Sequence, residues 1–497
     1  MYLWIVIAGG VAAFIASMGI GANDAANAFA TSVGSGALTL RQAAGLAVVF
    51  ETGGAILMGS HVTDTIRKGI ADYQCFEDDP NIFMYGCLWV IIAVGVWLFT
   101  ASYFEMPVST THSCVGGMVG MTIVLAGPNC VIWYKPLDTF PYVGGVGGIV
   151  MSWFISPILS GFLASFIYGC MRCIVLRRAY TTRRLLVIYP VLVGTTLLIN
   201  SFFIIYKGAK GLGLDKIDAI EAITYSLAIA GGGAFLTIPL IPKIKKMVDK
   251  KFHRVDMAGI ALQNLDNIRT SRTELNINST RQLQTVISIH QNAEQFDPMI
   301  EETFKYLQIF SAICDSFSHG ANDVANAIGP FAAIYTIYKS DGDLSKNINM
   351  GDDAYLILGL GGVGIALGLV VYGKKIIHAI GNKLCKITPS RGTCIELGSA
   401  LIIIAGSRLK IPLSTTHCQV GATVGVGLLE NRSCSHWRTT GIMGVNGYIL
   451  AKTAFGWVIT CVVVGATTAI MVAQGVYSPT IGENTNNFTN CSPVLVR

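Results

Sequence analysis

The sequence predicts an all-α polytopic membrane protein of about twelve transmembrane helices or re-entrant segments, arranged as two inverted-topology repeats. Three observations lead to this fold class. Hydrophobic residues make up 52% of the 497 residues and charged residues only 13%, whereas about a quarter of the residues of a soluble protein are charged. Apolar runs of about 20 residues, enough to cross a bilayer as a helix, recur along nearly the whole chain. Two short polar motifs each occur twice, once in each half of the chain.

The apolar runs are continuous, which favours helices over a membrane β-barrel, whose strands would alternate apolar and polar residues in short segments. The 55 glycines support this reading because small residues let membrane helices approach closely. The predicted spans are 2–30, 42–62, 83–104, 107–127, 143–171, 186–206, 219–242, 306–336, 354–373, 393–409, 412–430 and 446–475.

Basic residues gather in three connections between these spans, and the positive-inside rule places such connections in the cytoplasm. Successive basic connections are separated by two spans, so the assignment is self-consistent and leaves both termini extracellular. The first basic residue is Arg41, so the opening apolar run lacks the positive segment of a signal peptide and is kept as the first span. The basic residues are Arg172, Arg177, Arg178, Arg183, Arg184, Lys243, Lys245, Lys246, Lys250, Lys251, Lys374, Lys375, Lys383, Lys386 and Arg391.

The first repeated motif is Gly21-Ala-Asn-Asp-Ala-Ala-Asn-Ala-Phe29, which returns as Gly320-Ala-Asn-Asp-Val-Ala-Asn-Ala-Ile328. The two Asn residues of each copy share a helical face, with the Asp on its flank. Hydrogen bonding between helices would explain the Asn residues. A carboxylate inside a membrane costs at least about 2.5 kcal/mol, however, and a cation beside it would offset that cost. The motif therefore indicates a single polar site built from both copies.

The second repeated motif is Pro107-Val-Ser-Thr-Thr-His112, which returns as Pro412-Leu-Ser-Thr-Thr-His417. Proline followed by hydroxyl residues is typical of a helix N-terminus, which presents free backbone N–H groups and attracts anions. The hydroxyls add donors without charge, which suits a tetrahedral oxyanion that must later be released. A capping box at the membrane edge is the structural alternative, and the two His residues either titrate or serve the packing.

The first motif recurs after 299 residues and the second after 305, as an internal duplication would produce. Seven crossings separate the first span from its copy, so the two run in opposite directions and a substrate site is expected at the midplane between them. The fifth to seventh spans are expected to be an unpaired insert. The predicted organisation is inverted repeat 1 in 1–130, additional helices in 131–242, a cytoplasmic loop in 243–305, inverted repeat 2 in 306–440, a final helix in 441–475 and an external tail in 476–497.

Two further carboxylates, Glu51 and Glu396, lie in apolar runs and are candidate cation ligands or proton carriers. Their distances from the second motif differ, so they are not symmetry mates. Of the thirteen Cys, only Cys75, Cys130 and Cys491 fall in predicted external segments, where a disulfide is compatible with the redox environment. Asn278 matches the glycosylation pattern in a predicted cytoplasmic loop, whereas Asn487 matches it in the external tail.

Together with Phe50-Glu-Thr-Gly53 and Met151-Ser-Trp-Phe-Ile-Ser-Pro157, the paired motifs resemble the inorganic phosphate transporter (PiT) family, most of all its eukaryotic sodium-dependent symporters. The resemblance implies a secondary transporter that imports phosphate with sodium by alternating access. It implies sodium sites near Asn23, Asp24, Asn322 and Asp323, and acidic positions needed for transport at Glu51 and Glu396. It implies phosphate contacts from Asn27, Ser109, Thr110, Thr111, Asn326, Ser414, Thr415 and Thr416.

The expected ligands are inorganic phosphate and co-transported sodium ions, with no other cofactor and no nucleic acid. The expected location is the plasma membrane, as a multi-pass protein in the lipid bilayer, with a homodimer among the assemblies considered. The alternatives are a proton-coupled phosphate carrier, a carrier of another oxyanion such as sulfate, and a phosphate sensor or receptor without transport. An enzyme is disfavoured because no nucleophile, base and orienting group form a recognisable set. The chain also has no phosphate-binding loop of the ATPase type.

Overall fold

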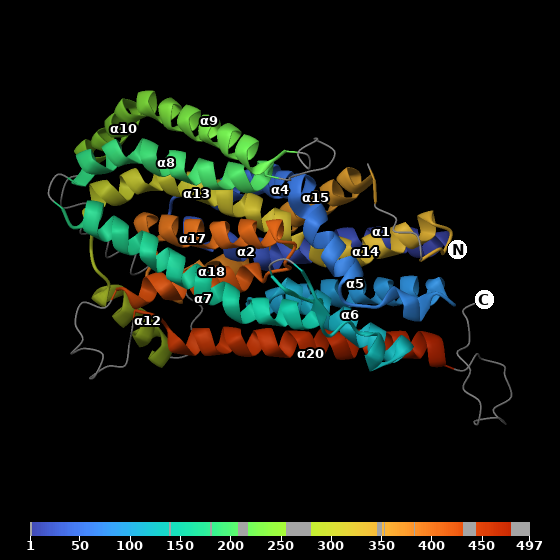
Figure 1. The fold of residues 1–497 in the computed structure, drawn as a ribbon. Helices are drawn as coiled ribbons and strands as arrows, with labels where there is room; N and C mark the ends of the chain where they lie inside the picture. The colour runs from blue at the N-terminus through green and yellow to red at the C-terminus, as the bar shows by residue number, and fades with distance from the viewer. Residues whose placement is uncertain are drawn as a thin grey trace, which may run out of the picture.

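The computed structural model is a bundle of long helices (Figure 1). It describes the chain except for residues 1, 139–140, 179–180, 207–216, 255–279, 345–349, 352, 382, 431–443 and 479–497. The glycosylation patterns at Asn278 and Asn487, and Cys491, lie outside the described residues. The all-α polytopic fold class predicted from the sequence is confirmed.

The first half of the chain contains a broken first span, a helical hairpin and two long crossing helices. Its elements are α1 (Leu3–Ile20), η1 (Gly21–Ala25), α2 (Ala26–Ala28), α3 (Ala30–Gly34), α4 (Leu40–Lys68), η2 (Tyr73–Phe76), α5 (Pro80–Tyr103), α6 (Thr110–Ala126), η3 (Pro128–Cys130), β1 (Lys135–Pro136), β2 (Val143–Gly144), α7 (Gly145–Met171), η4 (Arg172–Leu176), α8 (Thr181–Ile205), α9 (Ala219–Thr237), η7 (Ile238–Leu240) and α10 (Ile241–Arg254). The two short strands pair antiparallel.

The second half repeats the broken span and the hairpin. Its elements are α12 (Thr280–Asn292), α13 (Pro298–Asp323), α14 (Ala325–Lys339), α15 (Asp353–Tyr372), α16 (Lys374–Gly381), α17 (Pro389–Arg408), α18 (Thr415–Leu428) and α20 (Gly447–Tyr477). The predicted loop 243–305 therefore contains helical segments in its described parts, and its last residues form the start of α13.

Eight helices in the described part of the chain are long and apolar enough to cross a membrane. The predicted segments outside this set are α6, the pair α13 and α14, α17 and α18. Their residues are largely buried by the surrounding helices, so they do not need an apolar surface of their own. Polar side chains at membrane depth are tolerated where they face the protein interior, and these segments supply most of the polar site described below.

The first and last described residues lie at one end of the bundle (Figure 1). The start of α1 and the end of α20 are together, whereas α10 and α12 lie at the opposite end (Figure 1). A disulfide joins Cys75 to Cys130, in the connections that follow α4 and α6. Two of the three external cysteines singled out in the sequence are thus bonded to each other.

The helices α6 and α18 each begin at a Ser N-cap rather than at the proline of the motif. Ser109 and Ser414 accept hydrogen bonds from the backbone N–H groups of His112 and His417. The prediction that proline starts the helix is wrong by three residues, because Pro107 and Pro412 belong to an extended segment ahead of the cap. The same turn precedes each segment, with Glu105 and Lys410 at positive φ values of 54° and 60°.

Glycine contacts show how the two repeats correspond. A Cβ on Gly21 would lie 1.8 Å from the carbonyl oxygen of Ile365, and one on Gly320 would lie 2.1 Å from that of Glu51. The helices α1 and α15 therefore approach each other as α13 and α4 do. This packing makes Ile365 the counterpart of Glu51, which confirms that the two glutamates are not symmetry mates.

The correspondence also includes α7 and α20. Gly421 of α18 faces the carbonyl oxygen of Pro157, and Gly116 of α6 faces that of Cys461. On the same pair of helices, Trp153 stacks on the His112 ring at 3.5 Å, and Trp457 lies 3.7 Å from the His417 ring. The helix α7 packs on α18 of the second repeat in the way that α20 packs on α6 of the first. The expectation that 143–171 belongs to an unpaired insert is therefore wrong.

Buried ion pairs close the end of the bundle where α10 lies. Arg391 donates to the carboxylate of Glu430 at 2.6 Å and to the backbone carbonyl of Glu294 at 2.7 Å. Arg172 donates to the carboxylate of Glu294 at 2.7 Å, and the Tyr168 hydroxyl donates to Glu430. These contacts tie the ends of α7, α17 and α18 to the segment that leads into α13.

We expect Glu294→Gln to destabilise the protein by about 3 kcal/mol at pH 7, because it leaves buried guanidinium charge without its partner. Burial raises the pKa of Glu294, but the guanidinium groups of Arg177 and Arg172 more than offset this and hold it below its usual value. The contribution is therefore present above the unfolded pKa of about 4.3 and is lost as pH falls through the lower folded pKa.

Thermal unfolding of the detergent-solubilised wild-type protein and of Glu294→Gln, from pH 7 to pH 3, measures this effect. The melting temperatures of the two proteins should converge at the acid end. The control is Asp353→Asn, which breaks the exposed pair with Lys339 and should cost less than about 1 kcal/mol. Equal losses in the two variants would show that the buried pairs are not special.

Candidate functional site

Two carboxylates lie at breaks in the two first spans of the repeats. Asp24 sits in η1, a single π-helical turn between α1 and α2, and Asp323 ends α13 immediately before α14. Asp24 is 2% exposed and Asp323 is fully buried. Irregular backbone at membrane depth is found where it lines a cavity or a binding site, so these breaks mark the centre of the candidate site.

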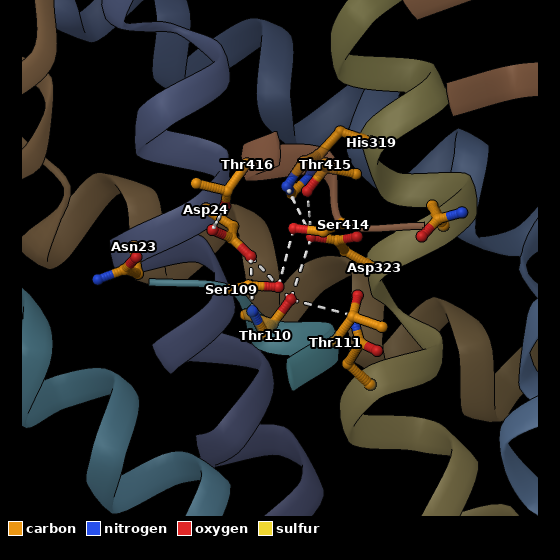
Figure 2. Close-up of polar contacts among 12 residues, drawn as sticks. Asn23, Asp24, Ser109, Thr110, Thr111, His319, Asp323, Ser414, Thr415 and Thr416 are labelled. Carbon is orange, nitrogen blue, oxygen red and sulfur yellow. Dashed lines mark hydrogen bonds and ion pairs between the residues drawn. The ribbon is translucent and has the colours of Figure 1, made fainter. Parts of the chain in front are cut away.

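Asp24 accepts hydrogen bonds from both second motifs (Figure 2). One carboxylate oxygen accepts from the Thr110 backbone N–H at 3.1 Å and from the Thr110 hydroxyl at 2.7 Å. The other oxygen accepts from the Thr416 hydroxyl of the opposite repeat. The N-terminus of α6, predicted from the sequence to attract an anion, thus faces a carboxylate of the protein itself in this structure.

Asp323 mirrors this arrangement from the second repeat. One of its oxygens accepts from the Thr415 hydroxyl at 2.7 Å and lies 3.2 Å from the Thr110 hydroxyl. Thr110 therefore lies between the two carboxylates, and its single proton can serve only one of them at a time. The other oxygen of Asp323 has no hydrogen-bond partner, which leaves it free to bind a ligand.

The starts of α6 and α18 meet at the same point. The Ser109 and Ser414 hydroxyls are 2.9 Å apart. Thr111 donates to the Leu413 carbonyl at 2.8 Å, and Thr416 lies 3.2 Å from the Val108 carbonyl, so each repeat bonds to the extended segment of the other. Five of the six predicted Ser and Thr residues thus bond across the repeat boundary, and Thr415 bonds to Asp323.

The Asn residues of the first motif have different surroundings. Asn23 donates to Ser102 and to the Met106 carbonyl and accepts from the Val108 N–H, all at 3.0–3.1 Å, so it holds the extended segment in place. Asn322 donates to Ser407 at 3.1 Å, but its carbonyl oxygen has no hydrogen-bond partner. Asn326 donates to Thr110 at 3.0 Å. Asn27 lies in α2, and its side chain is outside the described set.

Glu51 is connected to the site through a histidine. His319 Nδ1 lies 2.8 Å from Glu51, and His319 Nε2 lies 3.2 Å from Asp323. A doubly protonated imidazolium is the form that donates to both carboxylates. Glu51 also accepts from the Ser316 hydroxyl at 3.1 Å.

Glu396 occupies a cage of neutral donors. Its carboxylate accepts from Thr31, Ser32, Gln308 and Ser311 at 2.5–3.0 Å. The cage draws on α3, α13 and α17, so Glu396 links the end of the first broken span to the second.

Sequence reasoning did not select His319, Asp315, Gln308 or Ser311 as site residues. A signal was present, because the polar residues of α13 recur every three or four positions and form one buried helical stripe. The stripe comprises Gln308, Ser311, Asp315, His319 and Asp323. Of this stripe, only Asp323 belongs to the repeated motif, and the other four residues have no polar counterparts in the first half.

The site offers hydroxyls, amides and carboxylates, and among the described residues that bond to it His319 is the one cationic side chain. Such a set holds an oxyanion through hydroxyls and backbone N–H groups only when cations balance the nearby carboxylates. Inverted broken spans that meet at their centres, with half-helices pointing at the meeting place, define the class of secondary transporters.

The comparisons with known proteins agree. A model described as the phosphate transporter family matches residues 20–468, and the chain belongs to that family. It is 34% identical over 461 residues to inorganic phosphate transporter 2-1, chloroplastic, of Arabidopsis thaliana, covering 92% of this chain and 70% of that protein. It is 25% identical over 672 residues to sodium-dependent phosphate transporter 1 of Mus musculus, covering 95% of each.

A solved structure titled the sodium-dependent phosphate transporter is similar over 95% of this chain and 98% of its own, with a TM-score of 0.73 and 31% identity. The predicted resemblance is thereby confirmed at the level of the family and of the fold.

We expect Ser109→Ala and Ser414→Ala each to lower the stability by about 1 kcal/mol, because each removes an N-cap. Ser113→Ala is the matched control, since the Ser113 hydroxyl donates only within its own helix, to the Ser109 carbonyl. Thermal unfolding of the three variants measures the difference. A loss in Ser113→Ala as large as in the cap variants would contradict the assignment of the caps.

Proposed function

We propose that this protein imports inorganic phosphate across a membrane by symport with sodium ions, through alternating access between the two repeats. The observation that supports this most directly is the pair Asp24 and Asp323 at the meeting point of two opposed helix N-termini. The family membership supports phosphate as the substrate, and relatives named sodium-dependent transporters support sodium as the coupled ion. The family is one of transporters, not enzymes.

The electrostatics of the site explain why a cation would accompany phosphate. Phosphate carries between one and two negative charges near neutral pH, and the N-terminus of α6 already faces Asp24. An oxyanion placed there would be repelled unless a cation neutralised the carboxylate. The membrane potential adds about 2.3 kcal/mol per charge per 100 mV against an uncompensated anion moving inward.

The other buried charges do not supply this compensation. In the described part of the chain, Arg67 pairs with Asp64, Arg172 with Glu294 and Arg391 with Glu430. These pairs leave His319 as the cation that contacts the central carboxylates. Mobile cations are therefore needed, and sodium is the one that the relatives indicate.

The roles of the residues follow from their charges and, for Asp323 and Asn322, from an oxygen without a hydrogen-bond partner. We assign sodium binding to Asp24, Asp323 and Asn322, whose carbonyl oxygen is unpartnered, with Glu51 and Glu396 as acidic groups that respond to the ion. Phosphate would be held by the hydroxyls of the two second motifs together with Asn326 and Asn27. Asn23 positions the extended segment through its three hydrogen bonds rather than binding the ion directly.

The orientation in the membrane is supported by two independent features. The predicted basic connections include α10, which lies at the end opposite to the chain ends, and such connections face the cytoplasm. The Cys75–Cys130 disulfide is compatible with an oxidising exterior. We therefore place both termini outside the cell and the protein in the plasma membrane.

Uptake of labelled phosphate by proteoliposomes tests the function. An inward sodium gradient should drive accumulation, replacement of sodium by choline should abolish it, and excess sulfate should compete poorly. A proton gradient that drives equal uptake without sodium would identify proton coupling instead. No accumulation under either gradient would leave the sensor hypothesis standing and reject transport.

We predict that Asp24→Asn and Asp323→Asn each raise the sodium concentration for half-maximal uptake at least about tenfold, a change equivalent to about 1.4 kcal/mol of binding. The amide keeps the size of the side chain but removes the charge that attracts the ion. Thr415→Val is the comparison, because it removes a hydroxyl assigned to phosphate and should raise the phosphate constant more than the sodium constant. Sodium activation unchanged in both Asn variants would refute the sodium assignment.

A further inference from the structure

A small polar cavity lies beside the candidate site, on the side of the second repeat. It is formed by α13, α17 and α18 where they face the first broken span. Each of the three helices contributes two residues one turn apart. The lining residues are Asp24, Ala28, Asp315, His319, Ser399, Ile403, Thr415 and Gln419.

Three of these polar side chains, those of Asp315, Ser399 and Gln419, have no role in the phosphate and sodium contacts assigned above. Both carboxylate oxygens of Asp315, both polar atoms of Gln419 and the hydroxyl of Ser399 make no hydrogen bond of standard geometry. Asp315 is 1% exposed, Gln419 is 3% exposed and Ser399 is fully buried. An ionised buried carboxylate that has a neutral hydroxyl beside it, here that of Ser399, costs several kcal/mol, so a ligand is expected in the cavity.

The first repeat shows that the fold itself does not require polar groups here. With the separations of 299 and 305 residues, the counterparts of Asp315, Ser399 and Gln419 are Ala16, Val94 and Cys114. All three counterparts are buried in one hydrophobic core cluster. The same position in the architecture is thus filled by apolar packing in one repeat and by unpartnered polar groups in the other.

The chemistry of the cavity selects its ligand. Carboxylate, amide and hydroxyl oxygens are the ligands of hard cations. Asp315 and Asp24 would repel an anion such as phosphate, and the charge of His319, which also lines the cavity, is balanced by Glu51 and Asp323. The space is too narrow for a water molecule, so a hydrated divalent ion does not fit, whereas a dehydrated monovalent ion is smaller.

We propose that Asp315, Ser399 and Gln419 form a cation subsite that binds a dehydrated sodium ion, separate from the ion at Asp24 and Asp323. Its role in coupling rests on the proposed function, but its binding can be measured without transport. Gln419 lies one turn from Thr415, and Asp315 lies one turn from His319. An ion here therefore ties α18 to α13 beside the residues assigned to phosphate, and phosphate and this sodium should favour each other's binding.

Sodium-dependent thermal stabilisation of the purified protein, without phosphate and at constant ionic strength with choline, tests the subsite. Asp315→Asn should raise the midpoint sodium concentration at least about tenfold, and Gln419→Leu should raise it several-fold. The matched control is Thr423→Val, one turn further along α18, where the buried hydroxyl donates to the Gln419 backbone carbonyl. Thr423→Val should keep the wild-type midpoint.

Each outcome decides the proposal. A wild-type midpoint in both Asp315→Asn and Gln419→Leu overturns it, and so does an Asp315→Asn variant that changes only the pH dependence, because Asp315 would then hold a proton. If Asp315→Asn does not fold, Ser399→Ala and Gln419→Leu, which both keep the Asp315 carboxylate, replace it in the test. A wild-type midpoint sodium concentration in both of these variants would then overturn the proposal. Wild-type protein that binds sodium in this way but accumulates no phosphate would refute the proposed function and leave the subsite intact.

Discussion

The central interaction is the convergence of two half-helix N-termini on two carboxylates that share one threonine hydroxyl. Asp24 and Asp323 belong to different repeats, yet Thr110 lies within hydrogen-bond distance of both. The arrangement requires both first spans to break at their centres and both hairpins to turn back there. Because it places protein carboxylates where an oxyanion would bind, it makes anion binding dependent on cations.

Around this centre the packing follows the twofold symmetry of the repeats, whereas the additional charged residues do not. The hydroxyls, the caps, the turns at positive φ and the contacts between a Trp ring and a His ring all occur in both repeats. The charged groups around them do not, and an apolar residue occupies each equivalent position of the other repeat. The pairs are His319 with Ile20, Glu51 with Ile365, Asp315 with Ala16, and Glu396 with Ile91. The frame provides two exchangeable halves, and the added charges make ion binding unequal between them.

Much of the fold and of the site could be predicted because both leave periodic traces in the sequence. Apolar runs of bilayer length, the repeated motifs and their near-equal separation were sufficient to predict the class, the inversion and the motif residues that meet at the centre. The helix starts were misplaced by three residues because proline precedes a cap as readily as it begins a helix. The correspondence between α7 and α20 was missed because it rests on close contacts with glycines of α18 and α6, and these contacts leave no repeated motif in the sequences of α7 and α20.

The sequence by itself determined that the chain spans a membrane, that its halves are inverted and that Asn, Asp, Ser and Thr meet between them, since hydrophobic length and repetition are local properties. Only the tertiary structure decided which atoms meet. It placed Asn23 on the extended segment, joined Glu51 to Asp323 through His319, and left Asp315 without a hydrogen bond of standard geometry. The contacts of Asn23 and of Glu51 join residues 79 to 268 positions apart, and packing fixes such contacts whereas composition does not.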